Sequence, residues 1–475
     1  MTFGRLWAFL AIALPVLASL LASLPSVDLA YHLRAGGLTL DTGLIPASDT
    51  FTFTAYGEPW LNQNWGAQVV MAAVYRAAGW TGLAILRAAL VGALVGLVYF
   101  ACRAHGVNRR TAAWLTIAAF AIASVALALR PQLFGLVFFA ATVFLLAARR
   151  ERPRLLWLVP LVVVAWANAH GSFFLGPVLV ALAWLEDVHD GHTAATRTLL
   201  VAIAAAVAPV LNPFGPAVWL YATGLTTNPL VTERITEWQA TTLRTVPGFA
   251  FFASALLVAA FLARRGRTTS WPALLAFTVL FGIGAWAVRG IAWWGLGAAV
   301  MVAALVGAER GRATLEPLER PRPLNTVFAA LLVLAGVALL PIWRPVDPRL
   351  GAPAGTVANA PPGLTAAVSG LAREGDNLYV PQPWGSWFEF ATPAVRVVLD
   401  SRIELFPAGV WDRYEAVATG RPEWRAILDE WGVTLVIATD EGTPGLLDRL
   451  AADSGWREAY SDADGRLFVR ADRAP

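Results

Sequence analysis

The chain has 475 residues, of which 57% are hydrophobic and only 14% are charged. About a quarter of the residues of a soluble domain are charged, so this composition excludes an ordinary soluble protein. The net charge of +4 comes entirely from arginine, since lysine is absent, and the single Cys102 excludes an internal disulfide and a cysteine metal cluster. The first predicted element, the apolar run Leu6–Leu24, is long enough to cross a bilayer.

Apolar runs of roughly 15 to 22 residues recur as far as residue 343 and predict eleven membrane-spanning helices. Their ranges are 5–24, 80–101, 112–129, 131–148, 155–169, 172–185, 198–212, 248–263, 271–287, 290–308 and 326–343. The first run is longer than the usual apolar core of a signal peptide, so we predict a retained helix. The segment Gly66–Gly79 would rise only about 21 Å as a helix, and we predict that it lies at the interface within a first loop of residues 25–79.

The distribution of arginine predicts the topology. With the N-terminus in the cytoplasm, five arginine-rich loops fall on the cytoplasmic side, as the positive-inside rule requires. They contain Arg103, Arg109 and Arg110; Arg149, Arg150, Arg152 and Arg154; Arg197; Arg264, Arg265 and Arg267; and Arg310, Arg312, Arg320 and Arg322. Counting Gly66–Gly79 as a further span would put these arginine-rich loops outside. Eleven spans also place the C-terminal segment outside.

Beyond Trp343 the composition changes. Residues 344–362 are rich in Pro, Ala and Gly and predict a linker. Residues 363–475 alternate predicted helices (364–374, 410–418, 422–431 and 444–454) with predicted strands (377–381, 395–400, 433–438, 456–461 and 466–470). The predicted fold is therefore an all-α polytopic membrane bundle, residues 1–343, followed by a small extracytoplasmic α/β domain.

The predicted topology brings the polar motifs of the membrane region to the outer side. They are the first loop, Arg130-Pro131-Gln132, Asn168-Ala169-His170-Gly171, Leu211-Asn212-Pro213, Thr236-Glu237-Trp238-Gln239 and Arg289-Gly290. Each motif alone is equally compatible with a helix cap, a turn or a snorkelling side chain. Ionisable groups gathered on one side of a helical bundle indicate a shared cavity there.

The stretch from Ser26 to Gly36 follows the first span directly. If it forms a helix, Asp28, Tyr31 and His32 share one face, because residues three and four apart are neighbours. A carboxylate held at the membrane surface beside His32 and Arg34 could act as a general base. The alternative is a solvated helix exit with interfacial anchors.

The first loop resembles the GT-C superfamily of membrane glycosyltransferases, and within it a poorly characterised bacterial branch. The resemblance rests on an Asp-x-x-x-His-x-x-x-Gly stretch at Asp28, an Ile-Pro-x-x-Asp stretch ending at Asp49, and Pro-Trp-x-Asn beginning at Pro59. The later polar motifs and Asp400-Ser401-Arg402 resemble that branch as well. The resemblance implies inversion at a polyprenyl-phosphate sugar, with the acceptor deprotonated by Asp28 on the outer face of a bacterial plasma membrane.

Further site residues follow from this chemistry. A departing phosphate needs cations, and guanidinium groups bind phosphate bidentately. The expected phosphate-binding residues are Arg130, Arg289, Arg87 and His170. For Arg87 the alternative is an ion pair with an acid at the inner face, and for His170 it is a packed, hydrogen-bonded side chain.

The remaining expected substrate-binding residues are His32, Arg34, Asp49, Asn64, Asn168, Glu237, Trp238, Asp400 and Arg402. An acid beside an indole is a common way to hold a sugar, although Glu237 is also compatible with a solvated loop acid. Asn64 stands where the related branch has an acid. This departure weakens a two-carboxylate metal site, so a divalent metal is possible and its ligands are unknown.

The predicted function is transfer of a sugar from a polyprenyl phosphate to a glycan, lipid or protein acceptor. Membrane lipids are further expected partners, and no nucleic acid is expected to bind. No phosphate-binding loop or Gly-x-Gly-x-x-Gly motif indicates a soluble nucleotide sugar. The alternative is a non-catalytic scaffold or a transporter of lipid-linked sugars. A transporter should show internal repeats, which we do not find, but the short segments 155–169 and 172–185 form a tight pair around His170 that keeps this alternative open.

Overall fold

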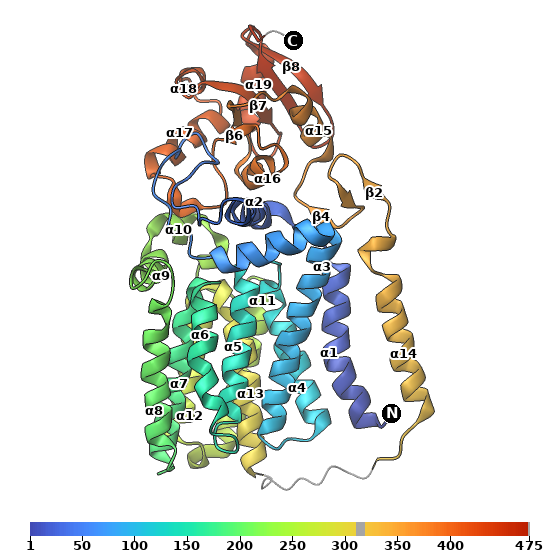
Figure 1. Cartoon of the computed structure of the whole chain (residues 1–475), viewed down its shortest axis with the longest axis vertical. Helices are drawn as coiled ribbons and strands as arrows, with labels where there is room; N and C mark the ends of the chain where they lie inside the picture. The colour runs from blue at the N-terminus through green and yellow to red at the C-terminus, as the bar shows by residue number, and fades with distance from the viewer. Residues whose placement is uncertain (310–318, 474–475) are drawn as a thin grey trace. The chain divides into compact units, whose positions relative to one another are not determined.

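A computed structural model describes residues 1–309 and 319–473, so the predicted cytoplasmic Arg310 and Arg312 lie outside the described residues. The chain divides into two compact units (Figure 1). The helical unit consists of Met1–Ala22 and Ala84–Trp343, and the mixed unit consists of Ser23–Leu83 and Arg344–Pro475. The structure thus groups the first loop with the C-terminal segment, whereas the sequence assigned it to the membrane domain.

Each of the eleven predicted spans coincides with a helix. The α-helices that lie in or enter the helical unit are α1 Phe3–Leu21, α3 Trp65–Ala104, α4 Arg109–Ala123, α5 Pro131–Ala147, α6 Leu158–Ala167, α7 Leu175–His189, α8 Ala195–Val207, α9 Ala217–Thr227, α10 Pro229–Arg234, α11 Val246–Arg265, α12 Trp271–Trp286, α13 Ile291–Glu309 and α14 Pro323–Ala338. Short 3-10 helices are η1 Ser124–Ala126, η2 Leu155–Trp157, η3 Gly171–Phe174, η4 Ala208–Val210, η5 Thr236–Trp238, η6 Gly266–Thr268, η7 Val288–Gly290 and η8 Pro341–Trp343.

Within residues 1–309 and 319–473, five helices are long and apolar enough to cross a membrane, and further apolar helices are shorter. The long ones are α1, α3, α11, the continuous segment Gly171–His189 and the segment Val288–Glu309. The prediction of a polytopic helical protein is confirmed, while the number of eleven spans stays a prediction. The sequence did not predict α9 and α10, which lie in the long loop between η4 and α11.

Helix α3 contains the boundary between the predicted interfacial helix and the second span. Gly79 interrupts the helix with φ 57° and ψ −152°. A side chain at this positive φ would be strained, so glycine allows the chain to change direction here. The residues before the interruption belong to the mixed unit, and the residues from Ala84 onward belong to the helical unit.

The mixed unit contains a five-stranded sheet with strand order β6-β5-β7-β9-β8. Its strands are β5 Asp376–Tyr379, β6 Val395–Val397, β7 Val433–Ala438, β8 Trp456–Ser461 and β9 Arg466–Arg470. Strand β5 is parallel to β6 and β7, and the β8–β9 hairpin pairs antiparallel with β7. The helices are α15 Pro362–Leu371, α16 Gln382–Ala391, α17 Ala408–Ala418, α18 Trp424–Glu430, α19 Pro444–Ala452 and the 3-10 turn η9 Ile403–Leu405. The five predicted strands are present, and α16 and η9 were not expected.

The first loop extends this sheet at the β6 edge. The Phe53 amide donates to the Val397 carbonyl at 3.1 Å, and the Val397 amide donates to the Phe51 carbonyl at 3.2 Å. Within the predicted linker, β4 Val357–Ala358 pairs with β1 Leu24–Pro25, and β2 Val346–Asp347 pairs with β3 Ala352–Pro353. Backbone hydrogen bonds therefore join the loop to chain segments more than three hundred residues away.

Helix α2, Ser26–Thr42, confirms the helix expected after the first span. It packs against α16 and crosses the first part of α3 at Gly36. A Cβ added to Gly36 would lie 2.2 Å from the Gln68 carbonyl oxygen, so this close crossing requires glycine. The position of the Asp28 helix within the mixed unit is thus determined by packing on two sides.

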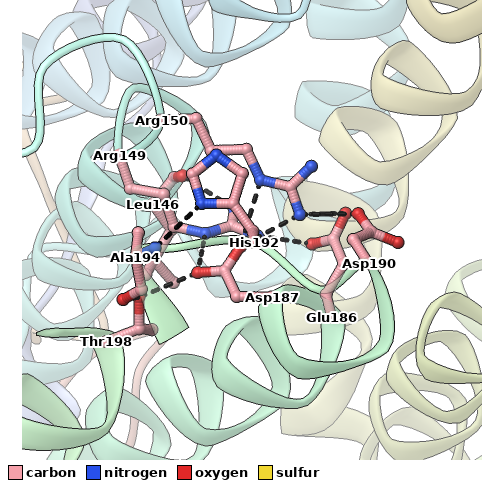
Figure 2. A network of polar contacts seen from close by, with 9 residues as sticks. All are labelled: Leu146, Arg149, Arg150, Glu186, Asp187, Asp190, His192, Ala194 and Thr198. Carbon is pink, nitrogen blue, oxygen red and sulfur yellow. Dashed lines mark hydrogen bonds and ion pairs between the residues drawn. The ribbon is translucent and has the colours of Figure 1, made fainter. Parts of the chain in front are cut away.

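A buried polar network joins the ends of α5, α7 and α8 in the helical unit (Figure 2). The fully buried Asp187 accepts hydrogen bonds from Arg149 at 3.0 and 3.1 Å, from Arg150 at 3.0 Å and from the Thr198 hydroxyl at 2.8 Å. Arg150 also donates to Asp190 at 2.7 Å. These two arginines, expected in a cytoplasmic loop, therefore form ion pairs with the end of α7, and the Thr198 hydrogen bond adds α8 to the network.

Candidate functional site

Four residues from three predicted motifs meet in the helical unit. One nitrogen of Arg130, Nη2, lies 2.6 and 2.8 Å from the two carboxylate oxygens of Glu237. Nη2 of Arg289 lies 3.6 Å from the same carboxylate, and the Arg289 guanidinium lies over the Trp238 ring, 4.4 Å from its centroid. We call Arg130, Glu237, Trp238 and Arg289 the two-arginine cluster.

Local sequence explains how these side chains are positioned. Arg130 precedes Pro131, adopts an extended backbone and forms the N-cap of α5. Glu237 and Trp238 lie in η5, and Arg289 lies in η7. The Val288 amide donates to the Gln239 carbonyl at 3.1 Å, and Thr241 bonds the end of α12, so η5 and η7 are held side by side.

The two-arginine cluster is partly open to solvent. The exposed fraction of the side chain is 15% for Arg130, 22% for Arg289 and 33% for Glu237. Two guanidinium groups that converge on one carboxylate can also bind phosphate oxygens, which have a similar geometry. One face of Trp238 is covered by a guanidinium, so the expected stacking of a sugar on the indole has only the other face available.

Asn168 and His170 make contacts that stabilise a turn. The Asn168 side-chain amide donates to the Val164 carbonyl at 2.8 Å and to the Leu211 carbonyl at 3.2 Å. Nδ1 of His170 accepts from the Ser172 amide at 3.2 Å and lies 2.7 Å from the Ser172 hydroxyl, so it caps η3. These contacts favour the structural alternative for both residues.

Arg87 contacts the C-terminal end of α1. Its Nη2 donates to the carbonyl oxygens of Ser19, at 2.5 Å, and of Ala22. These carbonyls belong to the last turn of α1 and its C-cap, where a cation satisfies unpaired acceptors and interacts favourably with the helix dipole. Its contacts favour a role in terminating α1.

Asp28 lies in the first turn of α2 in the mixed unit and is half-buried. A negative charge is stabilised at this position by the helix dipole. His32, one turn further along, is buried, and its ring centroid lies 3.9 Å from that of Tyr31, with the two rings tilted by 39°. Its Nδ1 lies 3.2 Å from Nε2 of Gln68. The backbone carbonyl of Asn64 accepts a hydrogen bond from the backbone amide of Gln68 at 3.1 Å. Asn64 therefore lies at the start of the helix that carries Gln68.

The Ile-Pro-x-x-Asp and Asp-Ser-Arg motifs meet inside the mixed unit. Nη2 of Arg402 lies 2.6 Å from Asp49, and its Nε lies 2.8 Å from Asp400. Asp49 also accepts from the Thr52 hydroxyl at 2.6 Å and amide at 3.0 Å. Tyr31, Phe51 and Trp60 surround the Arg402 guanidinium at 4.5 to 5.8 Å between its central carbon and the ring centroids.

A further acid, Glu389 on α16, faces the same group. It is fully buried, and neither carboxyl oxygen has a hydrogen-bond partner among the described residues. Burial and the negative charge of Asp400 raise the pKa of Glu389 well above its usual value, despite the opposing charges of Arg402 and Arg34. We call Asp49, Glu389, Asp400 and Arg402 the sealed cluster.

Arg34 lies at the edge of the sealed cluster. It donates a hydrogen bond to the backbone carbonyl of Glu389 and lies over the Phe51 ring at 4.8 Å. Burial lowers the pKa of Arg34, against the raising effect of Glu389 and Asp49. Asp49, Asp400 and Arg402 are almost completely buried. Their contacts therefore favour a structural role over direct contact with a sugar.

Sequence reasoning missed Glu389 because it lies on α16, a helix that was not expected. Its segment contains Pro383, Gly385 and four aromatic residues between 384 and 390, a poor signature for a helix. Among the described residues, no group of three or more His, Cys, Asp or Glu side chains is arranged to hold a metal ion.

No family model matches the sequence, and no curated protein matches it. Among solved structures, the archaeal oligosaccharyltransferase AglB from Archaeoglobus fulgidus, solved with an inhibitory peptide and a dolichol-phosphate, is similar over 99% of this chain and 74% of its own, with a TM-score of 0.58 and 13% identity. The fold is the GT-C fold. ArnT from Cupriavidus metallidurans is similar over 97% of both chains, with a TM-score of 0.47 and 15% identity. The GT-C fold expected from the first-loop motifs is thus confirmed.

Proposed function

We propose that this chain is a membrane glycosyltransferase that moves a sugar from a polyprenyl phosphate to an acceptor on the outer face of a bacterial plasma membrane. In this proposal the N-terminus is cytoplasmic and the C-terminal segment is extracytoplasmic. The observation that carries the proposal is the convergence of Arg130 and Arg289 on one carboxylate, within a GT-C fold.

The two-arginine cluster supports a phosphate site for three reasons. Its cations lie at the ends of apolar helices, where the phosphate of a lipid carrier would be found. Both guanidinium groups are held by neighbouring elements and remain partly exposed, so a ligand can reach them. A preorganised pair of guanidinium groups stabilises the charge that develops on a departing phosphate.

Asp28 is our proposed general base, on the strength of the first-loop resemblance and its place in the first turn of α2. In the proposed step, the oxygen of an acceptor hydroxyl attacks the anomeric carbon, and the bond between that carbon and the phosphate oxygen breaks. Polyprenyl phosphate leaves with the bonding electron pair, the configuration inverts, and the hydroxyl proton passes to Asp28.

The test uses the full chain in vesicles that contain the polyprenyl-phosphate sugars extracted from bacterial membranes. Mass spectrometry follows the loss of these lipids and the appearance of polyprenyl phosphate. Asp28→Asn keeps the shape and removes the basicity, so turnover per folded molecule should fall by a factor of about 10² to 10⁴.

Asp41→Asn is the matched control, because Asp41 lies on the same helix and pairs with the exposed Arg76. It should leave turnover nearly unchanged. Lipid-linked sugars that cross the bilayer intact and are never consumed would favour the transporter alternative. Near-normal turnover in Asp28→Asn would remove Asp28 from the mechanism.

A further inference from the structure

We infer that Glu237 lowers the affinity of the two-arginine cluster for a phosphomonoester more than for a phosphodiester, and thereby favours release of the product after transfer. This inference rests on the proposed function and concerns the charge of the ligand. It starts from the ion pairs of one acid with two guanidinium groups.

The charges of the cluster are unequal. Arg130 and Arg289 contribute two positive charges and Glu237 contributes one negative charge, so the three side chains carry a net charge of +1. A polyprenyl-phosphate sugar is a phosphodiester with a single negative charge. A phosphomonoester carries about −1.5 to −2 at neutral pH, so both its attraction to the guanidinium groups and its repulsion by Glu237 are larger.

The geometry makes Glu237 a direct competitor for phosphate oxygens. Both of its carboxylate oxygens lie within 2.8 Å of Arg130, and one lies 3.6 Å from Arg289. A phosphate bound by the same guanidinium groups must therefore lie within a few ångströms of this carboxylate. At such a distance and with partial exposure, each additional negative charge on the ligand is repelled substantially.

Sugar transfer increases the negative charge of the ligand, and repulsion by Glu237 opposes this increase. When the bond from the anomeric carbon to the phosphate oxygen breaks, the phosphate keeps the oxygen and its electron pair and becomes a monoester. The ligand gains negative charge beside Glu237, while the guanidinium groups are unchanged. Compared with a cluster that lacks this acid, Glu237 therefore weakens product binding more than donor binding.

The experiment measures binding of two probes to the full chain in a non-ionic detergent, at constant salt and pH. The probes are farnesyl monophosphate and its methyl diester. In Glu237→Gln the ratio of the two dissociation constants should shift by about tenfold toward the monophosphate. Glu237→Asp, which keeps the charge, should retain the wild-type preference.

Glu233→Gln is the matched control, because Glu233 lies in the preceding helix α10, is exposed, and undergoes the same loss of one charge. It should leave the ratio unchanged. Phosphatidylglycerol, a phosphodiester of the bilayer itself, is the third ligand. If it binds as tightly as the farnesyl diester, the site binds bulk lipid and the inference is overturned.

Two further outcomes separate the inference from the proposed function. If Glu237→Gln tightens both farnesyl probes equally, charge selection by Glu237 is overturned while the phosphate site stands. If neither probe binds to wild type or to any variant, both the phosphate site and the selection are overturned. Binding of both probes with a shifted ratio supports both.

Discussion

The two-arginine cluster and the sealed cluster are built from the same residue types in opposite proportions. In the helical unit two guanidinium groups share one carboxylate, and all three side chains keep some exposure. In the mixed unit one guanidinium serves two carboxylates, a third carboxyl group lies nearby, and every member is buried. In the first arrangement cations outnumber acids, whereas in the second the acids outnumber the central cation.

In this comparison burial, rather than residue type, distinguishes the proposed binding site from a structural bridge. A buried ion pair contributes little net stability compared with apolar packing, but removing one partner leaves an uncompensated buried charge. The sealed cluster should therefore respond to substitution through folding. The two-arginine cluster should respond through binding.

Arg402→Leu should have the largest effect on stability. It leaves Asp49 and Asp400 buried without their cation, which should lower the free energy of unfolding of the mixed unit by about 3 to 5 kcal/mol. Limited proteolysis in increasing urea measures this loss. Arg413→Leu is the control, because Arg413 forms an ion pair with the exposed Glu430 and should cost about 0 to 1 kcal/mol. Equal losses in the two variants would mean that the sealed cluster does not stabilise the unit.

Arg289→Ala should weaken ligand binding and leave stability nearly unchanged. Farnesyl monophosphate should bind about 10- to 100-fold more weakly, because a charge-assisted contact to phosphate is removed. The resistance of the chain to urea should stay close to that of wild type, since Arg289 keeps partial exposure. Unchanged binding together with a large loss of stability would show that the two-arginine cluster is structural, and the contrast between the clusters would disappear.

Glu389→Gln should have little effect at about pH 4 to 5 and an effect that grows as the pH rises. Because the folded state raises the pKa of Glu389 above its usual value near 4.5, the folded chain retains a proton that the unfolded chain loses. The stability of wild type should therefore fall relative to the variant as the pH rises above about 5, by at most about 1.4 kcal/mol per pH unit. Urea titrations from pH 4 to 8 measure the difference. Parallel curves for the two proteins would show that Glu389 does not titrate between the folded and unfolded states in this range.

The sequence predicted most of the elements because their signals are local. Apolar runs located the helices, and alternation with turn residues located β7, β8 and β9. The change in direction at Gly79 was anticipated because Gly66–Gly79 was too short to span a bilayer. Helix α16 was missed because its proline, glycine and aromatic residues form a helix only when packed against α2 and β6.

The candidate site was predicted in its residue types but only partly in its grouping. Arg130, Glu237 and Arg289 were each singled out, and the structure brings them together. Asp49 and Arg402 were also singled out. No local sequence pattern reveals that two polar residues 353 positions apart in the chain form a buried ion pair. Burial is a property of the tertiary structure. It is the one feature that distinguishes Glu389 from an ordinary surface acid, so the sequence could not identify this residue.

The bond between Asp49 and Arg402 also has a consequence for biosynthesis, because it joins residues 353 positions apart. At about 5 to 20 residues per second, a ribosome needs roughly 20 to 70 seconds to reach Arg402 after it has made Asp49. During that interval the first loop has neither its guanidinium partner nor the β6 edge with which Phe51 and Phe53 pair. The mixed unit therefore assembles only after translation has passed the last helix of the membrane region, and the first loop made is among the last parts of the chain to fold.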